Sequence, residues 1–208
     1  MRIAILYFGR SKHFDLTYPS LEKCIGTQHR IDVFYSCDND PVESIDKFVN
    51  MCKPVSVIND TISSYVDFSQ YPIMNPEIHR PNYTNMARHF INKKRVFTIF
   101  EEYIHTSGIV YDLVISARLD IHLDTLSILT PAPNTIYIPE GHDYFGINDR
   151  FAMGNVDVMK KYMMIYDSAV HILESKLSDP HPESLTLANI KYQLLVIERI
   201  TLNTQILK

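Results

Sequence analysis

The sequence predicts an α/β fold with a mostly parallel central sheet and helices on both faces. The first observation is the order of elements in residues 2–58, where strand and helix patterns alternate as β-α-β-α-β. The second is the form of the strand patterns, which are short apolar runs such as RIAILYF at 2–8. The third is size, because 208 residues, 46% of them hydrophobic, can enclose a full core as one domain.

The elements of the first half follow from their local patterns. Strands are expected at residues 2–8, 30–36 and 54–58. A helix is predicted at 17–27, with Pro19 in its first turn. A second helix is predicted at 38–52, where Asp40 as N-cap precedes Pro41 at the first helical position. This order implies that the three strands pair in parallel through right-handed crossovers.

The second half begins with a long polar, proline-containing loop at 59–83, a length that is usually functional or mobile. The longest helix is predicted at 84–108, with Thr84 as N-cap and Gly108 as its stop. A fourth strand opens the segment YDLVISARLDIHLD at 111–124. The remaining expected elements are strands at 135–139, 151–154 and 194–202 and helices at 155–176 and 181–193.

Composition excludes several classes of function. The formal net charge is −4 and no Lys/Arg-rich run occurs, which argues against nucleic acid as the main partner. The three cysteines share no C-x-x-C spacing, so we expect neither a disulfide framework nor a zinc cage, and a reducing compartment. No apolar run approaches the roughly 20 residues of a membrane span. We therefore expect a soluble cytoplasmic domain without a membrane span. The final NTQILK has no polar tail, so residues 1–208 could be the N-terminal part of a longer protein.

The segment at 111–124 ends in a group of charged residues. In an open α/β sheet, ligands bind beyond the carboxyl ends of the parallel strands. Asp120 could hold a divalent cation there, and the cation could hold a substrate's phosphates. Arg118 lies on the same face of the strand and could pair with phosphate or carboxylate. The alternative is that Arg118 and Asp120 form only a solvated ion pair at the rim.

Two segments carry a resemblance to a known family. YDLVISARLDIHL is similar to the segment of GT-A-fold nucleotide-sugar glycosyltransferases in which a hydrophobic strand runs into a D-x-D motif. Arg118 stands at the first position of that motif and Asp120 at the metal-binding second Asp. IYIPEGHDYFGINDRFAMGNVDVM at 136–159 resembles the corresponding region of viral and capsular glycosyltransferases. The whole is similar to the glycosyltransferase domains of large algal (chlorella) DNA viruses, which glycosylate capsid proteins.

The resemblance implies a GT-A-like (Rossmann-type) sheet and a single UDP-sugar-dependent glycosyltransferase domain of the hexosyltransferase type. The donor would be a UDP-sugar, the transferred group a hexose or deoxyhexose, and the acceptor a glycan or glycoprotein. Mn²⁺ or Mg²⁺ would bind Asp120, inversion of configuration is favoured, and the location would be the host cytoplasm if the protein is viral.

Two carboxylates are the catalytic candidates. Asp149, in the loop at 140–150, could bind acceptor hydroxyls or act as general base, and its alternative reading is a turn residue. Glu183 stands in HPES at 181–184, and in related enzymes a "PE" at a helix start points into the acceptor site. The alternative for Glu183 is a first-turn acid favoured by the helix dipole.

Nucleotide contacts are expected around the end of the first strand. There Gly9 permits close backbone approach and an aromatic ring can stack on uracil. The expected donor-binding residues are Tyr7, Phe8, Gly9 and Arg10, with Tyr35, Asp38, Met86 and Arg88 as further candidates beside Arg118. Met86 and Arg88 could equally be core and surface residues of a helix.

Other classes of function remain open from the residues alone. One is a non-catalytic nucleotide- or glycan-binding module of a larger protein, and another is a different metal-assisted phosphotransfer or hydrolytic enzyme. No P-loop or G-x-G-x-x-G motif occurs, which argues against P-loop and dinucleotide chemistry.

Overall fold

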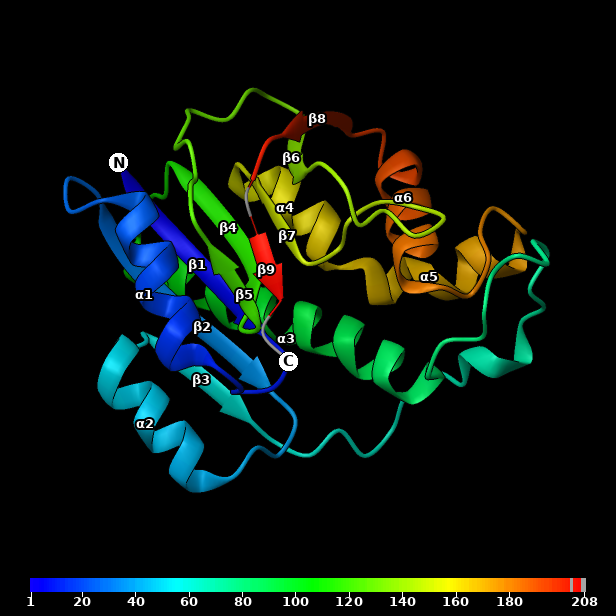
Figure 1. Cartoon of the computed structure of the whole chain (residues 1–208), viewed down its shortest axis with the longest axis horizontal. Helices are drawn as coiled ribbons and strands as arrows, with labels where there is room; N and C mark the ends of the chain where they lie inside the picture. Colours follow the sequence, from blue (N-terminus) through cyan, green and yellow to red (C-terminus); the bar gives the residue numbers. More distant parts are fainter. Residues whose placement is uncertain (203, 207–208) are drawn as a thin grey trace.

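A seven-stranded sheet with helices on both faces organises the chain in the computed structural model, which describes residues 1–202 and 204–206 (Figure 1). The strand order is β3-β2-β1-β4-β7-β6-β8. The strands are β1 (Arg2–Phe8), β2 (Arg30–Cys37), β3 (Ser56–Asn59), β4 (Leu113–Arg118), β6 (Thr135–Pro139), β7 (Phe151–Gly154) and β8 (Val196–Ile200). The α/β class predicted from the sequence is confirmed, and the sheet is compatible with a Rossmann-like fold.

The pairing directions show that the sheet is mixed but mostly parallel. β1 pairs in parallel with both β2 and β4, and β2 pairs in parallel with β3, as the alternating order of elements predicts. β7 runs antiparallel between β4 and β6, and β6 pairs in parallel with β8. A separate two-stranded ladder joins β5 (Ile121–Leu123) to β9 (Thr204–Ile206).

Two layers of helices cover the sheet. The helices are α1 (Phe14–Ile25), α2 (Val42–Cys52), α3 (Tyr83–Ser107), α4 (Val156–Met163), α5 (Ile165–Glu174) and α6 (Pro182–Tyr192), with a 3₁₀ turn η1 (Phe68–Gln70) before α3. Ile3, Ile5 and Tyr7 of β1 pack on the side of α1 and α2, whereas the intervening Leu6 and Phe8 pack on the side of α3 and α4. Because successive strand side chains point to opposite faces, the apolar run of β1 fills both cores.

A third core lies away from the sheet. It joins the start of α3 to η1, α5 and α6 through buried side chains that include Phe68, Met86 and Phe90. This core fixes the first turns of α3 and α6 relative to each other. Both turns carry side chains of the candidate site.

Two helix starts differ from the prediction. α1 begins at Phe14, which is buried against the ring of Phe48 at 5.6 Å, so Pro19 lies inside the helix rather than in its first turn. The N-cap of α2 is Pro41 rather than Asp40. The Asp40 carboxylate accepts the backbone N–H of Ser11 instead, which ties the loop after β1 to the loop after β2.

The N-cap of α3 also lies two residues before the predicted one. Its N-cap is Asn82, whose side chain accepts the N–H of Asn85 at 2.9 Å, and Thr84 is already helical. The predicted stop at Gly108 is confirmed, with φ of 66° at the C-cap.

The single helix predicted at 155–176 is two helices, α4 and α5, that meet at Met164. Asn155 caps α4 as expected by accepting the N–H of Val158 at 2.9 Å. Met163 packs in the core beside the sheet, whereas Ile165 packs in the third core. Because of the break, α4 packs in the core beside the sheet and α5 packs in the third core. The spacing of apolar residues in the sequence does not show this change. No helix among residues 1–202 and 204–206 is long and apolar enough to cross a membrane.

Candidate functional site

A cavity of about 600 Å³ opens at the carboxyl ends of β1, β2 and β4. Its walls come from the loop after β1, the first half of α3 and the turn after β4. They are lined by Phe8, Gly9, Arg10, Lys12, His13, Asp38, Asn85, Arg88, His89, Asn92, Arg118, Leu119 and Asp120. The predicted rim residues of three different strands therefore meet at one site, because parallel strands end at the same edge.

Gly9 directly follows β1, and at this residue the chain leaves the sheet to form part of the cavity wall. Its φ of 96° is in a region that residues with a side chain rarely adopt, and its N–H donates to the carbonyl of Ser36 at 3.0 Å. The hydroxyl of Tyr35 donates to the carbonyl of Gly9 at 2.8 Å. The loop that carries Arg10 and Lys12 is thus held against the end of β2.

Cationic side chains outnumber acidic ones in the cavity. Four cations line it, namely Arg10, Lys12, Arg88 and Arg118, against the two acids Asp38 and Asp120. Arg88 Nε lies 3.0 Å from Asp38 Oδ2, and Asp38 Oδ1 accepts the N–H of Ile62 at 2.7 Å. Within the described residues, Arg10 and Lys12 have no ion-pair partner.

Arg118 and Asp120 form the ion pair that the sequence left open as an alternative. Arg118 donates from Nε to Asp120 Oδ1 at 2.9 Å and from Nη2 to Asp120 Oδ2 at 2.5 Å. Burial lowers the pKa of Arg118, but the hydrogen bonds to Asp120 and the negative charges of Asp120, Asp149 and Glu183 together more than offset it, and the net direction is upward. Both acids of the cavity are therefore neutralised by arginines, and Arg10 and Lys12 leave it positive.

The arrangement around Asp120 does not fit a divalent-cation site. Both carboxylate oxygens of Asp120 accept hydrogen bonds from the guanidinium group of Arg118. In the part of the chain that the structure describes, no group of three or more His, Cys, Asp or Glu side chains could hold a metal. Mn²⁺ or Mg²⁺ at Asp120 stays a prediction from the resemblance alone.

The wall nearest α3 backs onto a buried polar cluster formed by His89, Lys93, Asp149 and Tyr162. The carboxylate of Asp149 is 4% exposed, and its Oδ2 lies 3.1 Å from His89 Nε2. Lys93 is fully buried, donates from Nζ to the Tyr162 hydroxyl at 3.1 Å, and lies 4.5 Å above the centre of that ring. A buried charge is tolerated only when it is paired or hydrogen-bonded, and here Lys93 is bonded to Tyr162 while the carboxylate of Asp149 lies against His89.

The pKa values of the cluster follow from burial opposed by these pairs. Burial would raise the pKa of Asp149, but His89, Lys93 and Arg118 together hold it well below its usual range. Burial lowers the pKa of Lys93 to about 8, with Asp149 opposing the shift. Burial also lowers the pKa of His89. At neutral pH the cluster thus contains an ionised Asp149, a charged Lys93 and a neutral His89.

Glu183 lies in the first turn of α6 and has a different environment. Its carboxylate is 13% exposed, and its Oε2 lies 3.3 Å from His181 Nδ1. Burial, and then the negative charge of Asp149, raise the pKa of Glu183 to about 7. The two candidate carboxylates therefore act on each other electrostatically, and one is ionised while the other titrates near neutrality.

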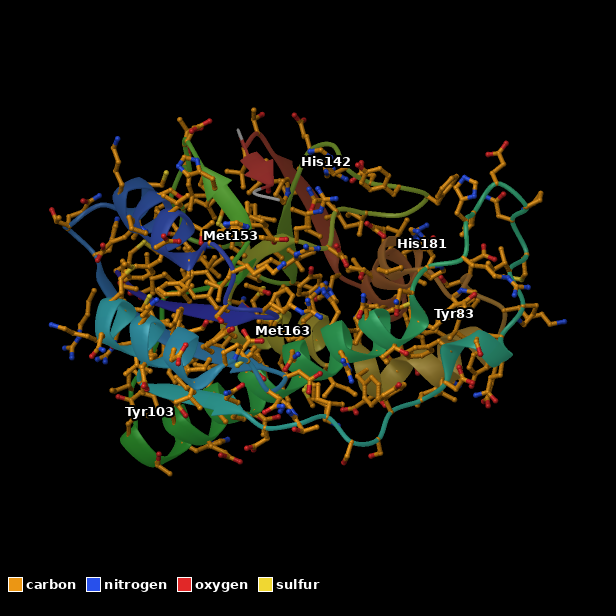
Figure 2. All side chains as sticks on the ribbon, turned by 60° about the horizontal axis from the view of Figure 1, so that its bottom comes forward. Tyr83, Tyr103, His142, Met153, Met163 and His181 are labelled. Atoms are coloured by element: carbon orange, nitrogen blue, oxygen red, sulfur yellow. The ribbon has the colours of Figure 1, made fainter. Side chains whose placement is uncertain are left out.

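The loop at 140–150 holds the start of α6 through the backbone (Figure 1). Ile147 donates its N–H to the carbonyl of Glu183 at 3.1 Å, and a Cβ on Gly146 would lie 2.1 Å from that carbonyl group. Figure 2 shows His142 on this loop and His181 at the start of α6 on the same side of the molecule. Gly146 is required here because only a residue without a side chain permits this approach.

Three of the expected nucleotide-binding residues do not line the cavity. Tyr7 is 1% exposed and packs edge-on against Phe48, on the opposite face of β1 from Phe8. Tyr35 is fully buried in the same core, and Met86 is 2% exposed in the third core. Phe8, Gly9, Arg10, Asp38, Arg88, Arg118 and Asp120 do line it.

The sequence reading missed His89 and Lys93. The available signal was their spacing of four on the long helix, which places both on one helix face. Lys93 also stands among the buried residues Phe90, Val96 and Phe97, an unusual neighbourhood for a lysine.

A family model covers most of the chain. A family model described as "Domain of unknown function (DUF7796)" matches residues 1–175, that is 175 of the 208 residues. The match includes the residues that line the cavity and Asp149, and it ends before Glu183. A search of the curated proteins finds no match. The chain belongs to the DUF7796 family.

Proposed function

We propose that the protein is a UDP-sugar-dependent glycosyltransferase with a GT-A-like fold, which transfers a hexose or deoxyhexose to a glycan or glycoprotein. The observation that carries the proposal is the positive cavity at the carboxyl ends of β1, β2 and β4, whose two acids are both paired with arginines. Its volume of about 600 Å³ suits a ligand of nucleotide size. Following the resemblance, the acceptor would be a glycan of a capsid protein.

The cations of the cavity supply the electrostatic part of the reaction. The departing nucleoside diphosphate gains negative charge as its bond to the sugar breaks, and fixed donors aimed at that charge lower the barrier. Arg10 and Lys12 are available for this, and Arg118 is held in place by Asp120. Phe8 and Gly9 line the cavity at the end of β1, where the nucleotide would lie.

Glu183 is the better candidate for the general base. An inverting displacement requires a base on the side of the sugar opposite the leaving group, and the base works best with a pKa near the working pH. Glu183 has a pKa of about 7, whereas Asp149 is enclosed by cations that favour its ionised form. This reverses the order of roles expected from the sequence, where Asp149 was the first candidate.

Titration of nucleotides tests the donor half of the proposal. Binding of UDP, ADP, GDP and inorganic pyrophosphate is measured by calorimetry, with and without Mn²⁺. We expect UDP to bind more tightly than ADP or GDP. Equal affinity for the three nucleotides would leave only a phosphate site, and absence of binding by all four ligands would overturn the proposal.

Hydrolysis of UDP-sugars tests the chemistry without knowledge of the acceptor, because water can replace the acceptor hydroxyl. We expect Glu183→Gln to lower kcat about 10²–10⁴-fold with UDP affinity unchanged. The exposed Glu140 supplies the matched control, and Glu140→Gln should retain the wild-type rate. A chain that binds UDP but cleaves no UDP-sugar would instead be a non-catalytic binding module.

A further inference from the structure

His89 occupies an unusual place between the cavity and a buried carboxylate. The residue lines the cavity, its side chain is 17% exposed, and its Nε2 lies 3.1 Å from Asp149 Oδ2. Phe8 packs edge-on against the imidazole at 5.0 Å between centres, which restricts rotation of the ring. The ring can therefore respond to a ligand in the cavity while it keeps its contact with Asp149.

Charged groups reach His89 from three elements. Lys93 lies one turn later on α3, Arg118 comes from the end of β4, and Asp149 comes from the loop before β7. Arg88, the preceding residue of α3, is paired with Asp38 at 3.0 Å. Glu183 influences the same cluster through Asp149 and Lys93.

In the ligand-free state these groups leave the imidazole neutral at pH 7. Burial is the largest cause that lowers the pKa of His89, and the positive charges of Lys93 and Arg118 act in the same direction. Asp149 opposes them and supplies a counter-ion for the protonated ring. A balance of this kind changes when a new charge arrives, because a nearby anion favours the charged form of a histidine.

We infer that His89 takes up a proton when a diphosphate enters the cavity, and that the resulting imidazolium, held by Asp149, becomes an additional cation that binds the phosphates. The inference deepens the proposed function, since it rests on a diphosphate-bearing ligand, but it does not depend on the base or on the sugar. Lys93 and Asp149 are positioning residues in this scheme. Lys93 favours the ionised state of Asp149, and Asp149 holds the ring.

Proton uptake has a direct consequence for affinity. Where the free protein holds neutral His89 and the complex holds the imidazolium, one proton is bound for each ligand. The affinity then rises up to tenfold for each unit by which the pH falls, and the effect disappears below the pKa of His89 in the free protein. A histidine that only fills space would lower affinity equally at every pH when it is replaced.

The test is calorimetry of UDP and of inorganic pyrophosphate at pH 7 in PIPES and in Tris, two buffers whose ionisation enthalpies differ widely. The dependence of the heat on the buffer counts the protons that are bound. We expect His89→Gln to take up fewer protons than the wild type, by up to one for each ligand bound, and to show a flatter dependence of Kd on pH. His122→Gln is the matched control, because His122 lies on β5 outside the cavity lining, and it should behave as the wild type.

The outcomes test the inference and the proposed function separately. The ligand phosphates can release protons on binding, so the difference between the two proteins isolates His89. Equal net proton exchange in His89→Gln and wild type would overturn the inference while UDP binding remains. Pyrophosphate binding with uptake but without any preference for UDP would support the inference and contradict the nucleotide specificity. If neither ligand binds, both fail. Should His89→Gln not fold, the ¹⁵N histidine spectrum of the wild type with and without pyrophosphate reports the protonation state directly.

Discussion

Replacement of Glu183 by glutamine should stabilise the protein at pH 8 but not at pH 4.5. In the folded chain the pKa of Glu183 is raised from 4.5 to about 7, with burial as the largest cause and the charge of Asp149 as the second. Between these two values the folded state binds more protons than the unfolded state, so the free energy of unfolding falls as the pH rises. The destabilisation is absent below 4.5 and complete above about 7.

The magnitude follows from the pKa difference. About 1.4 kcal/mol for each pKa unit gives an upper limit of roughly 3 kcal/mol for Glu183. Part of the side chain faces solvent, which screens the effect, so we expect about 1–2 kcal/mol. Glutamine has nearly the same shape and does not titrate, so Glu183→Gln removes this contribution while it keeps the packing of the first turn of α6.

The assay is urea denaturation of wild type and Glu183→Gln at pH 4.5 and pH 8. At each pH we take the urea midpoint of the mutant minus that of the wild type. We expect this difference to be roughly 0.5 M larger at pH 8 than at pH 4.5. The exposed Glu140 again serves as control, and Glu140→Gln should show a difference within about 0.5 kcal/mol at both pH values. The reasoning is refuted if the difference in midpoint is the same at pH 4.5 and pH 8. Ionisation of the Glu183 carboxylate would then not destabilise the folded state.

Three further substitutions test the geometry of the site. Arg118→Ala removes a cation from the cavity and leaves the Asp120 carboxylate unpaired, so we expect UDP to bind at least tenfold more weakly in calorimetry, as for the loss of a charged hydrogen bond. Asp120→Asn removes the counter-charge of Arg118 and one of the two acceptors that orient its guanidinium, so UDP binding should weaken equally with Mn²⁺ and with EDTA. A loss confined to the Mn²⁺-dependent part would restore Asp120 as a metal ligand. Gly146→Ala places a methyl group 2.1 Å from the backbone of Glu183 and should lower the free energy of unfolding by about 1–3 kcal/mol, whereas an unchanged urea midpoint would show that the loop and α6 separate easily.

The sequence determined the α/β class and the edge of the sheet at which the cavity opens. The apolar runs of β1, β2 and β4 are local signals, and the alternating order of elements fixes their parallel pairing. Residues that directly follow such strands must gather at one edge, so Gly9, Arg10 and Asp120 could be placed at the rim before any coordinates. The sequence also indicated Asp149 and Glu183, but only through resemblance.

The tertiary structure alone decided which side chains face the cavity and which charges meet. Tyr7 and Phe8 are adjacent and both aromatic, and the packing of α1 and α2 against one face and α3 against the other assigns Tyr7 to a core and Phe8 to the site. His89 and Asp149 are 60 positions apart in the sequence, and they meet only because α3 packs on β1 and β2 while the antiparallel strand β7 begins beside the carboxyl end of β4. Strand and helix periods are set by neighbouring residues, whereas burial, ion pairing and the pKa of a carboxylate depend on groups that come together only when the chain folds.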